Sequence, residues 1–365
     1  MVLDPNSSYS SAYTPVPYFL GHVFYRIHPC LLTVRILNAI IFVLSVLIAY
    51  KLFFQVTKKA ALTLAAFYAL NPYLLRAGYL YLMSNYGILF ALIGIYFYFY
   101  YKGNFQFWIA HISWLLAVLS MQWMLMIYVA IILYEFEQYI LDKNKVKEFF
   151  KLFLIKMVSL MPAFYLFYLW QGLTHPNFHA HTLKSSLPHF DAVLAVLGFW
   201  FFFFIVQNIR KIKWQIFKTL IFITPILLMN LPMHSNNHGN NVITGIVSSL
   251  CEKVELISGF PYDISTGILV LLGAIGLILI WEETDNELKH FLYIASGLIT
   301  AFSASVLLGA SHIFIMIPFI IFALQRVIVQ RKAIFNLLLI QSLTIVVVYN
   351  LYIIFLRPYG AYFVG

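Results

Sequence analysis

Long apolar runs separated by short polar breaks make up most of this sequence. A helix that crosses the hydrocarbon core of a bilayer needs roughly 20 apolar residues, and several of the runs reach that length. Read against their breaks, the runs predict spans at residues 31–54, 60–75, 79–101, 105–120, 121–134, 150–170, 190–208, 216–232, 265–281, 290–308, 313–329 and 333–356. The pattern predicts an all-α, polytopic membrane protein with about 12 transmembrane helices.

The composition points to the same class of protein. Hydrophobic residues account for 62% of the 365 residues and charged residues for 10%, whereas charged residues make up about 25% of soluble proteins. The breaks leave no room for a large soluble domain, so residues 1–365 are expected to form a single transmembrane domain. The net charge of +10 does not indicate nucleic-acid binding, because Lys and Arg cluster just beyond the apolar runs, where such residues set membrane topology.

The distribution of Lys and Arg predicts which face is cytoplasmic. In the alternating topology 17 of these 23 residues fall on one side, and only six fall on the other: Arg26, Arg35, Arg76, Lys184, Lys253 and Arg357. The richer side is predicted to be cytoplasmic. The loops at 171–189 and 232–264 then lie on the outer or lumenal face of a plasma membrane or endoplasmic reticulum. So does the segment 1–30, read as a loop followed by an interfacial helix, VPYFLGHVFYRI.

The histidines gather on the face that is poor in Lys and Arg, and the carboxylates are divided more evenly between the two faces. Nine of the eleven histidines are assigned outside, which suggests that this face carries the chemistry; the alternative is that the outer loops are simply polar. Eight carboxylates, Glu135 among them, are interpreted as a solvated cytoplasmic rim among lysines. The other five are Asp4, Asp191, Glu252, Glu255 and Asp263, of which Asp191 begins a span and Glu252 and Glu255 belong to a predicted amphipathic interfacial helix at 242–259. With no acid placed in the middle of a span, ion-coupled transport is disfavoured.

Two basic groups on the outer face are candidate anion sites. The loop that contains His175, His179, His181 and Lys184 lacks the ligand spacing of a zinc site, so no metal or other cofactor is predicted. Such a loop suits a lipid-linked phosphate instead. Arg76, between Tyr73 and Tyr79, either binds a phosphate or anchors the chain at headgroup depth. The two cysteines, Cys30 and Cys251, are interpreted as core thiols.

Two segments near the start of the chain resemble the GT-C superfamily of integral-membrane glycosyltransferases. This superfamily includes protein O-mannosyltransferases, aminoarabinose transferases and dolichyl-phosphate-sugar transferases. Its recurrent DP…TPP-Y-L segment and R-L-N helix start are similar to DPNSSYSSAYTPVPYFLGHVFYRI and the following VRILNAIIFVLSVLIAYKLF. Its paired third and fourth helices resemble LTLAAFYALNPYLLRAGYLYLMSNYGILFALIGIYFYFYYKG. The layout is similar over most of the chain, and the motifs over about the first hundred residues.

The resemblance implies an activity and roles for individual residues. A sugar would pass from a polyprenyl-phosphate donor to a glycan, lipid or protein acceptor on the outer face, next to the membrane lipids. Asp4 would act as the base or orient the acceptor, and Tyr13 and Tyr18 would contact the sugar. The groups implied on the phosphate side are Arg76, His175, His179, His181, Lys184 and His312.

Other interpretations stay open on the sequence alone. Members of the superfamily usually carry a further span and an acidic residue before this segment. The resemblance therefore implies either that Met1 is an internal methionine or that the usual base has been lost. A catalytically inactive or truncated subunit is one alternative function. A membrane transporter or lipid flippase is another, which predicts broken helices and a polar site near the midplane of the membrane.

Overall fold

A computed structural model of the chain describes residues 14–71, 74–75, 84–101, 103–140, 145–174, 187–208, 210, 246–303 and 310–356. These residues form fourteen α-helices joined by short 3-10 turns, and they contain no strand, which confirms the all-α prediction. The helices are α1 (Val16–Ile27), α2 (Leu31–Val56), α3 (Ala61–Ala69), α5 (Ser84–Tyr100), α6 (Asn104–Val118), α7 (Leu125–Ile140), α8 (Val146–Trp170), α9 (Leu187–Trp200), α10 (Phe202–Asn208), α12 (Ile246–Ser258), α13 (Tyr262–Glu283), α14 (Lys289–Ser303), α15 (Ala310–Gln330) and α16 (Lys332–Leu356).

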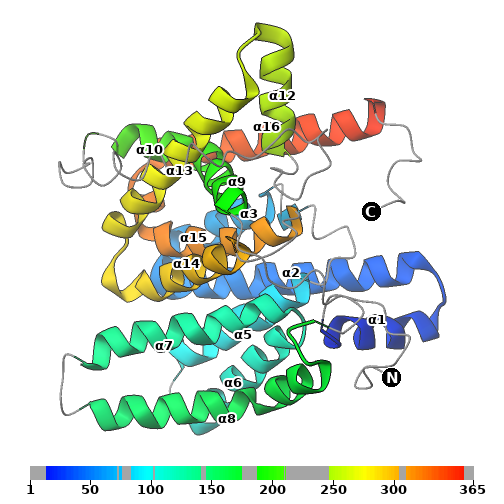
Figure 1. Cartoon of the computed structure of the whole chain (residues 1–365), viewed down its shortest axis with the longest axis vertical. Helices are drawn as coiled ribbons and strands as arrows, with labels where there is room; N and C mark the ends of the chain where they lie inside the picture. Colours follow the sequence, from blue (N-terminus) through cyan, green and yellow to red (C-terminus); the bar gives the residue numbers. More distant parts are fainter. Residues whose placement is uncertain are drawn as a thin grey trace.

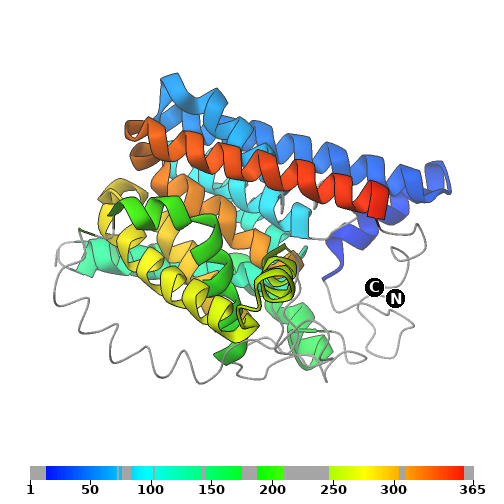
Figure 2. The same cartoon turned by 90° about the horizontal axis from the view of Figure 1, so that it is seen from above.

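The long helices run back and forth along one axis. In Figure 1 the end of α7, the start of α8 and the α13–α14 and α15–α16 connections lie at the left, and α1, the start of α2 and the end of α16 lie at the right. Figure 2 shows the same grouping from above. We refer to the first group as the lysine-rich end, because Lys58, Lys59, Lys145, Lys289 and Lys332 belong to its turns and helix starts. The opposite group is called the loop end, because residues 175–186 and 304–309 interrupt the described chain there.

Three of the helices are long and apolar enough to cross a membrane: α2, α8 and α13. Together α9 and α10 would make a fourth candidate, but they are bent by 76° where they meet. The predicted span at 190–208 therefore consists of two helices with a sharp bend between them, which form either a broken span or a re-entrant segment. Shorter apolar helices occur at 84–100, 315–330 and 335–348. Predicted span 216–232 and residues 232–245 of the predicted loop at 232–264 lie outside the described residues.

The two helices that were expected to lie at a membrane surface are present. The predicted VPYFLGHVFYRI helix is α1, with Pro17 and Gly21 buried. It ends at Ile27 because His28 adopts an extended backbone (φ −145°, ψ 105°), as the residue before Pro29 is expected to do. The predicted amphipathic helix at 242–259 is α12, somewhat shorter than expected. Its side chains Leu256 and Ile257 are more than four-fifths exposed.

An aromatic contact joins the N-terminal and C-terminal helices in the core. Phe322 of α15 packs against Phe53 of α2 and against Phe291 of α14, with ring centroids 4.5 and 5.1 Å apart. All three rings are fully buried. Since large buried aromatic rings contribute strongly to packing, these contacts hold α2, α14 and α15 as one core.

Candidate functional site

Most of the residues predicted to form the site fall outside the described chain. Those are Asp4, Tyr13, Arg76, His175, His179, His181 and Lys184. The backbone of His312 lies in the first turn of α15 at the loop end, and Tyr18 is half-buried on α1. The roles assigned to all nine residues stay predictions. The described residues contain two other buried polar sites, one centred on Asp191 and one on Glu135.

Helix α1 lies against the loop end of the first helices. The hydroxyl of Thr14 donates to the carbonyl of Val118 at 3.0 Å, and the amide of Val16 donates to the carbonyl of Leu119 at 2.9 Å. Both acceptors are at the end of α6, so the start of α1 is held there by two hydrogen bonds. Phe19 and Ile27 are 67% and 75% exposed, which leaves α1 with an apolar outer face suited to lipid.

The first buried site is a carboxylate in α9. Asp191 stands four residues after the start of the helix and is 1% exposed. Neither of its carboxylate oxygens has a hydrogen-bond partner among the residues that the structure describes. A buried polar group is nearly always hydrogen-bonded, and leaving a carboxylate without a partner is costly. Such a group is therefore a strong candidate for contact with a ligand.

A very close crossing with α13 fixes the position of this carboxylate. A Cβ atom added to Gly198 would lie 2.8 Å from the amide nitrogen of Gly273 and would clash with the carbonyl oxygen of Leu269. A Cβ atom on Gly273 would clash in turn with the carbonyl oxygen of Leu194. The backbones of α9 and α13 thus touch without side chains between them. Only glycine at both positions permits this approach.

The two helices run in the same direction through the crossing, as Figure 2 shows for the green α9 and the yellow α13. Asp191 precedes Gly198 by about two helical turns, and Thr266 precedes Gly273 by the same interval. Thr266 is also fully buried. Helical periodicity therefore brings both polar residues to the loop-end side of the crossing, on the facing stripes of α9 and α13.

Helix α12 packs over this end of α9 and α13. It buries Val247 and Cys251 and leaves Lys253 exposed. Glu255, interpreted from the sequence as a solvated acid, is half-buried and accepts a hydrogen bond from the backbone amide of Tyr262 at 3.3 Å. Because Tyr262 is the first residue of α13, the carboxylate satisfies a helix N-terminal donor. This contact ties α12 to the end of α13 that faces Asp191.

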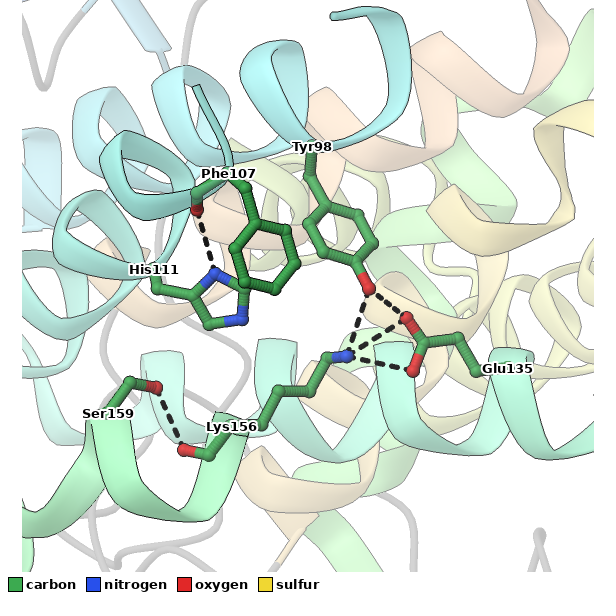
Figure 3. Close-up of polar contacts among 6 residues, drawn as sticks. All are labelled: Tyr98, Phe107, His111, Glu135, Lys156 and Ser159. Carbon is green, nitrogen blue, oxygen red and sulfur yellow. Dashed lines mark hydrogen bonds and ion pairs between the residues drawn. The ribbon is translucent and has the colours of Figure 1, made fainter. Parts of the chain in front are cut away.

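The second buried site joins α5, α7 and α8 (Figure 3). The ammonium of Lys156 donates to both carboxylate oxygens of Glu135, at 2.9 and 2.8 Å, and to the hydroxyl of Tyr98 at 3.0 Å. Tyr98 donates in turn to Glu135. Lys156 is fully buried and Glu135 is 4% exposed. The interpretation of Glu135 as a solvated rim residue is wrong, and Lys156 lies buried beside it.

His111 of α6 lies next to this cluster. Its ring centroid is 5.8 Å from that of Tyr98, and Nδ1 is 2.9 Å from the carbonyl oxygen of Phe107. A carbonyl only accepts, so Nδ1 carries a proton and donates it. Nε2 has no partner within the described helices. The imidazole therefore presents a free nitrogen beside a fully satisfied ion pair (Figure 3).

The sequence contained a signal for each buried site. Lys156 interrupts the apolar run LFLIKMVSLM, and Asp191 interrupts LPHFDAVLAVLGFW. A lone charge inside such a run is costly in a membrane and marks a paired or functional residue. Charge counting assigned both residues to a side of the membrane and ignored their depth in the helices. Glu135 and Asp191 are both buried inside apolar helices of the described chain.

Comparison with known proteins gives no relative for this chain. No protein-family profile matches it, and no curated protein or solved structure is similar to it at a significant level. The functional interpretation therefore depends on the residues and their geometry.

Proposed function

We propose that this chain is a multi-pass membrane glycosyltransferase that moves a sugar from a polyprenyl-phosphate donor to an acceptor hydroxyl at the loop end. The observation that carries the proposal is the buried carboxylate of Asp191, which has no partner among the described residues. It lies in the first turns of α9, which follows the predicted outer loop at 171–189, and α9 contacts α12 of the predicted loop at 232–264. A transferase needs such a base within hydrogen-bond reach of the acceptor.

The proposed reaction uses two kinds of group. Asp191, with or in place of Asp4, takes the proton of the acceptor hydroxyl as its oxygen bonds to the anomeric carbon. The bond between that carbon and the phosphate oxygen breaks, and the electron pair leaves with the polyprenyl phosphate. Arg76 and the histidines of the 171–189 loop are the cationic groups assigned to the departing phosphate, where positive charge stabilises the transition state most.

The arrangement of helices supports the finer topology that belongs to this proposal. Consecutive helices alternate in direction, and their lysine-bearing turns gather at one end. By the positive-inside rule that end is assigned to the cytoplasm and the loop end to the outer or lumenal face. We infer about 12 spans, with α5, α6, α7, α14, α15 and α16 as further crossings beyond the longest helices.

The test supplies purified full chain in liposomes with a labelled polyprenyl-phosphate sugar and a panel of glycan, lipid and protein acceptors. We expect Asp191→Asn to lower the transfer rate about 100-fold or more, the usual effect of removing a general base. The matched control is Asp263→Asn, because Asp263 is an exposed carboxylate in the first turn of α13. Its rate should stay within about twofold of wild type.

Two results would count against the proposal. A folded wild-type chain that transfers no sugar to any acceptor would argue against glycosyl transfer itself. An Asp191→Asn chain with the wild-type rate would remove Asp191 from the mechanism and leave Asp4 as the candidate base.

One observation favours a transporter or lipid flippase as the second candidate. The Tyr98, Glu135 and Lys156 cluster is a buried ionisable site inside a helical bundle, and such sites in membrane proteins often lie on a transport path. The two functions separate in one assay. A transporter moves a labelled lipid or solute across sealed liposomes without breaking a covalent bond, and it loses this activity in Glu135→Gln but retains it in Asp191→Asn.

A further inference from the structure

A pocket opens at the lysine-rich end, between the start of α3 and the turn from α15 to α16. Its volume is about 260 Å³. Its lining includes the polar side chains of Lys59, Thr63, Lys332 and Asn336 and the apolar side chains of Leu64 and Phe335. Figure 2 shows the first turns of α16 beside α3, at the end of the bundle opposite α1 and the last turns of α16. The pocket is thus remote from Asp191 and from α1.

The two lysines of this pocket carry the positive charge that a ligand would meet. Both are exposed, and neither has an ion pair within the described part of the chain. Nearby acids are engaged by arginines instead: Arg326 pairs with Asp285 and Glu287 at 3.0 and 2.7 Å, and Arg331 pairs with Glu283 at 3.1 Å. No carboxylate lines the pocket. Its charge is therefore uncompensated by the described protein.

The apolar residues that line the pocket suit contact with hydrocarbon. Leu64 is fully buried, and Phe335 packs edge-on against Phe67 with ring centroids 5.9 Å apart. Just outside the pocket, Leu62 on α3 is 74% exposed and Ile340 on α16 is 59% exposed. A ligand with a charged head and an apolar tail would have contacts for both parts.

The start of α16 adds a favourable field for an anion. Lys332 is the first residue of this 25-residue helix, so its unpaired N-terminal amides and the positive end of its dipole lie beside the pocket. Together with the two lysines, this end of the helix favours a phosphate over a neutral or cationic group.

We propose that this pocket binds an anionic phospholipid, with the phosphate held between Lys59 and Lys332. Thr63 and Asn336 supply further donors, and the acyl chains lie along Leu62 and Ile340. The volume agrees with this assignment, because whole small-molecule ligands usually occupy about 300–1,000 Å³ and this pocket is smaller. It therefore takes a headgroup and leaves the chains outside. Basic pockets between helices at the cytoplasmic surface are typical sites for acidic lipids.

The experiment measures displacement of a fluorescent phosphatidylglycerol from the purified full chain in an uncharged detergent. Unlabelled phosphatidylglycerol should displace the probe, whereas phosphatidylcholine and inorganic phosphate at the same concentration should not. The double variant Lys59→Gln/Lys332→Gln should bind the probe about 30-fold more weakly, since each lysine near an acidic headgroup contributes roughly a factor of five. The charge-retaining variant Lys59→Arg/Lys332→Arg should bind within about threefold of wild type.

A matched control separates the site from general electrostatics. Lys147 and Lys151 are exposed lysines near the start of α8, at the same end of the bundle, and neither lines the pocket. The variant Lys147→Gln/Lys151→Gln changes the net charge equally and should bind as wild type does. The proposal is overturned if this control loses as much affinity as the pocket variant, or if the pocket variant binds normally. It is also overturned if phosphatidylcholine or inorganic phosphate displaces the probe as well as phosphatidylglycerol does.

Discussion

Glu135 and Asp191 are both buried carboxylates in apolar helices, but their surroundings differ. Glu135 accepts hydrogen bonds from Lys156 and Tyr98, and the three groups together form a neutral cluster that links three helices. Asp191 has no partner among the described residues and lies beside a crossing of two backbones. Burial alone therefore does not distinguish a structural acid from a functional one, whereas the state of its hydrogen bonds does.

The difference assigns the two acids to different tasks. A buried ion pair whose hydrogen bonds are all satisfied loses stability when one partner is removed. A buried carboxylate without a partner lowers the stability of the folded protein. We therefore expect that such a residue is present for its function. Two experiments test this contrast and a third compares the two native thiols, taken in order of expected effect.

The largest effect is expected from Glu135→Gln. This change leaves the ammonium of Lys156 buried without a counter-ion, which should lower the free energy of unfolding by about 3–5 kcal/mol. The double variant Glu135→Gln/Lys156→Met removes both charges and should recover most of that loss. Unfolding in detergent, followed by circular dichroism, measures both variants.

The matched control for this measurement is Glu148→Gln, because Glu148 is an exposed acid in the first turn of α8. Its stability should stay within about 0.5 kcal/mol of wild type. If Glu135→Gln unfolds at the wild-type midpoint, the cluster does not stabilise the bundle, and its ionisable groups are better explained by transport.

A smaller effect of opposite sign is expected from Asp191→Asn. Replacing an unpartnered buried carboxylate with a neutral isostere should raise the free energy of unfolding by about 1 kcal/mol, even though activity falls. The same unfolding measurement detects the change. A loss of stability as large as that of Glu135→Gln would mean that Asp191 has a structural partner after all, and the contrast between the two acids would fail.

The smallest expected effect is a difference in labelling rate between the two native cysteines. It needs no mutation, because the two thiols differ in environment. The hydroxyl of Thr33 lies 3.2 Å from the sulfur of Cys30 and lowers the pKa of this half-buried thiol. Burial raises the pKa of Cys251 in α12. A lower pKa gives more thiolate at neutral pH, so a membrane-impermeant maleimide added outside intact cells should modify Cys30 well before Cys251.

The same labelling experiment tests the sidedness that belongs to the proposed function. Detergent-solubilised protein serves as its control, because there Cys30 is accessible whichever face it occupies. Labelling of Cys30 only after the membrane is opened would place the loop end in the cytoplasm and reverse the assigned topology.

The sequence predicted most of the helices and little of the polar geometry. Predicted runs such as 31–54 and 333–356 correspond closely to α2 and α16, because continuous apolar residues determine both burial in lipid and helix length. The bend between α9 and α10 was not predicted, since the aromatic run FWFFFFIV (199–206) continues through it without a proline or a polar break. The counts of charged residues on each side of the predicted topology likewise gave no information about how deeply a charged side chain lies within the bundle.

The pairing of Glu135 with Lys156 illustrates why the rest could not be predicted. The two residues are on different helices, and each has other charged residues close to it in the sequence, such as Glu137 and Lys151. Only the packing of α7 against α8 determines that Glu135 points inward to the buried ammonium of Lys156. Glu137 instead accepts a hydrogen bond from the hydroxyl of Tyr293. Asp191 was recognised as an outer acid, but its burial depends on α12 and α13, which are distant in the chain.

The glycine crossing of α9 and α13 has a mechanical consequence. Sliding one helix over another requires side chains that exchange rotamers, and at Gly198 and Gly273 there are none to exchange. The two helices should therefore move together as a single rigid unit. Under the proposed function, we expect access to Asp191 to involve displacement of α12, which contacts both helices and carries an exposed apolar edge at Leu256 and Ile257. Motion of α12 at the membrane surface would thus set how often the carboxylate is uncovered.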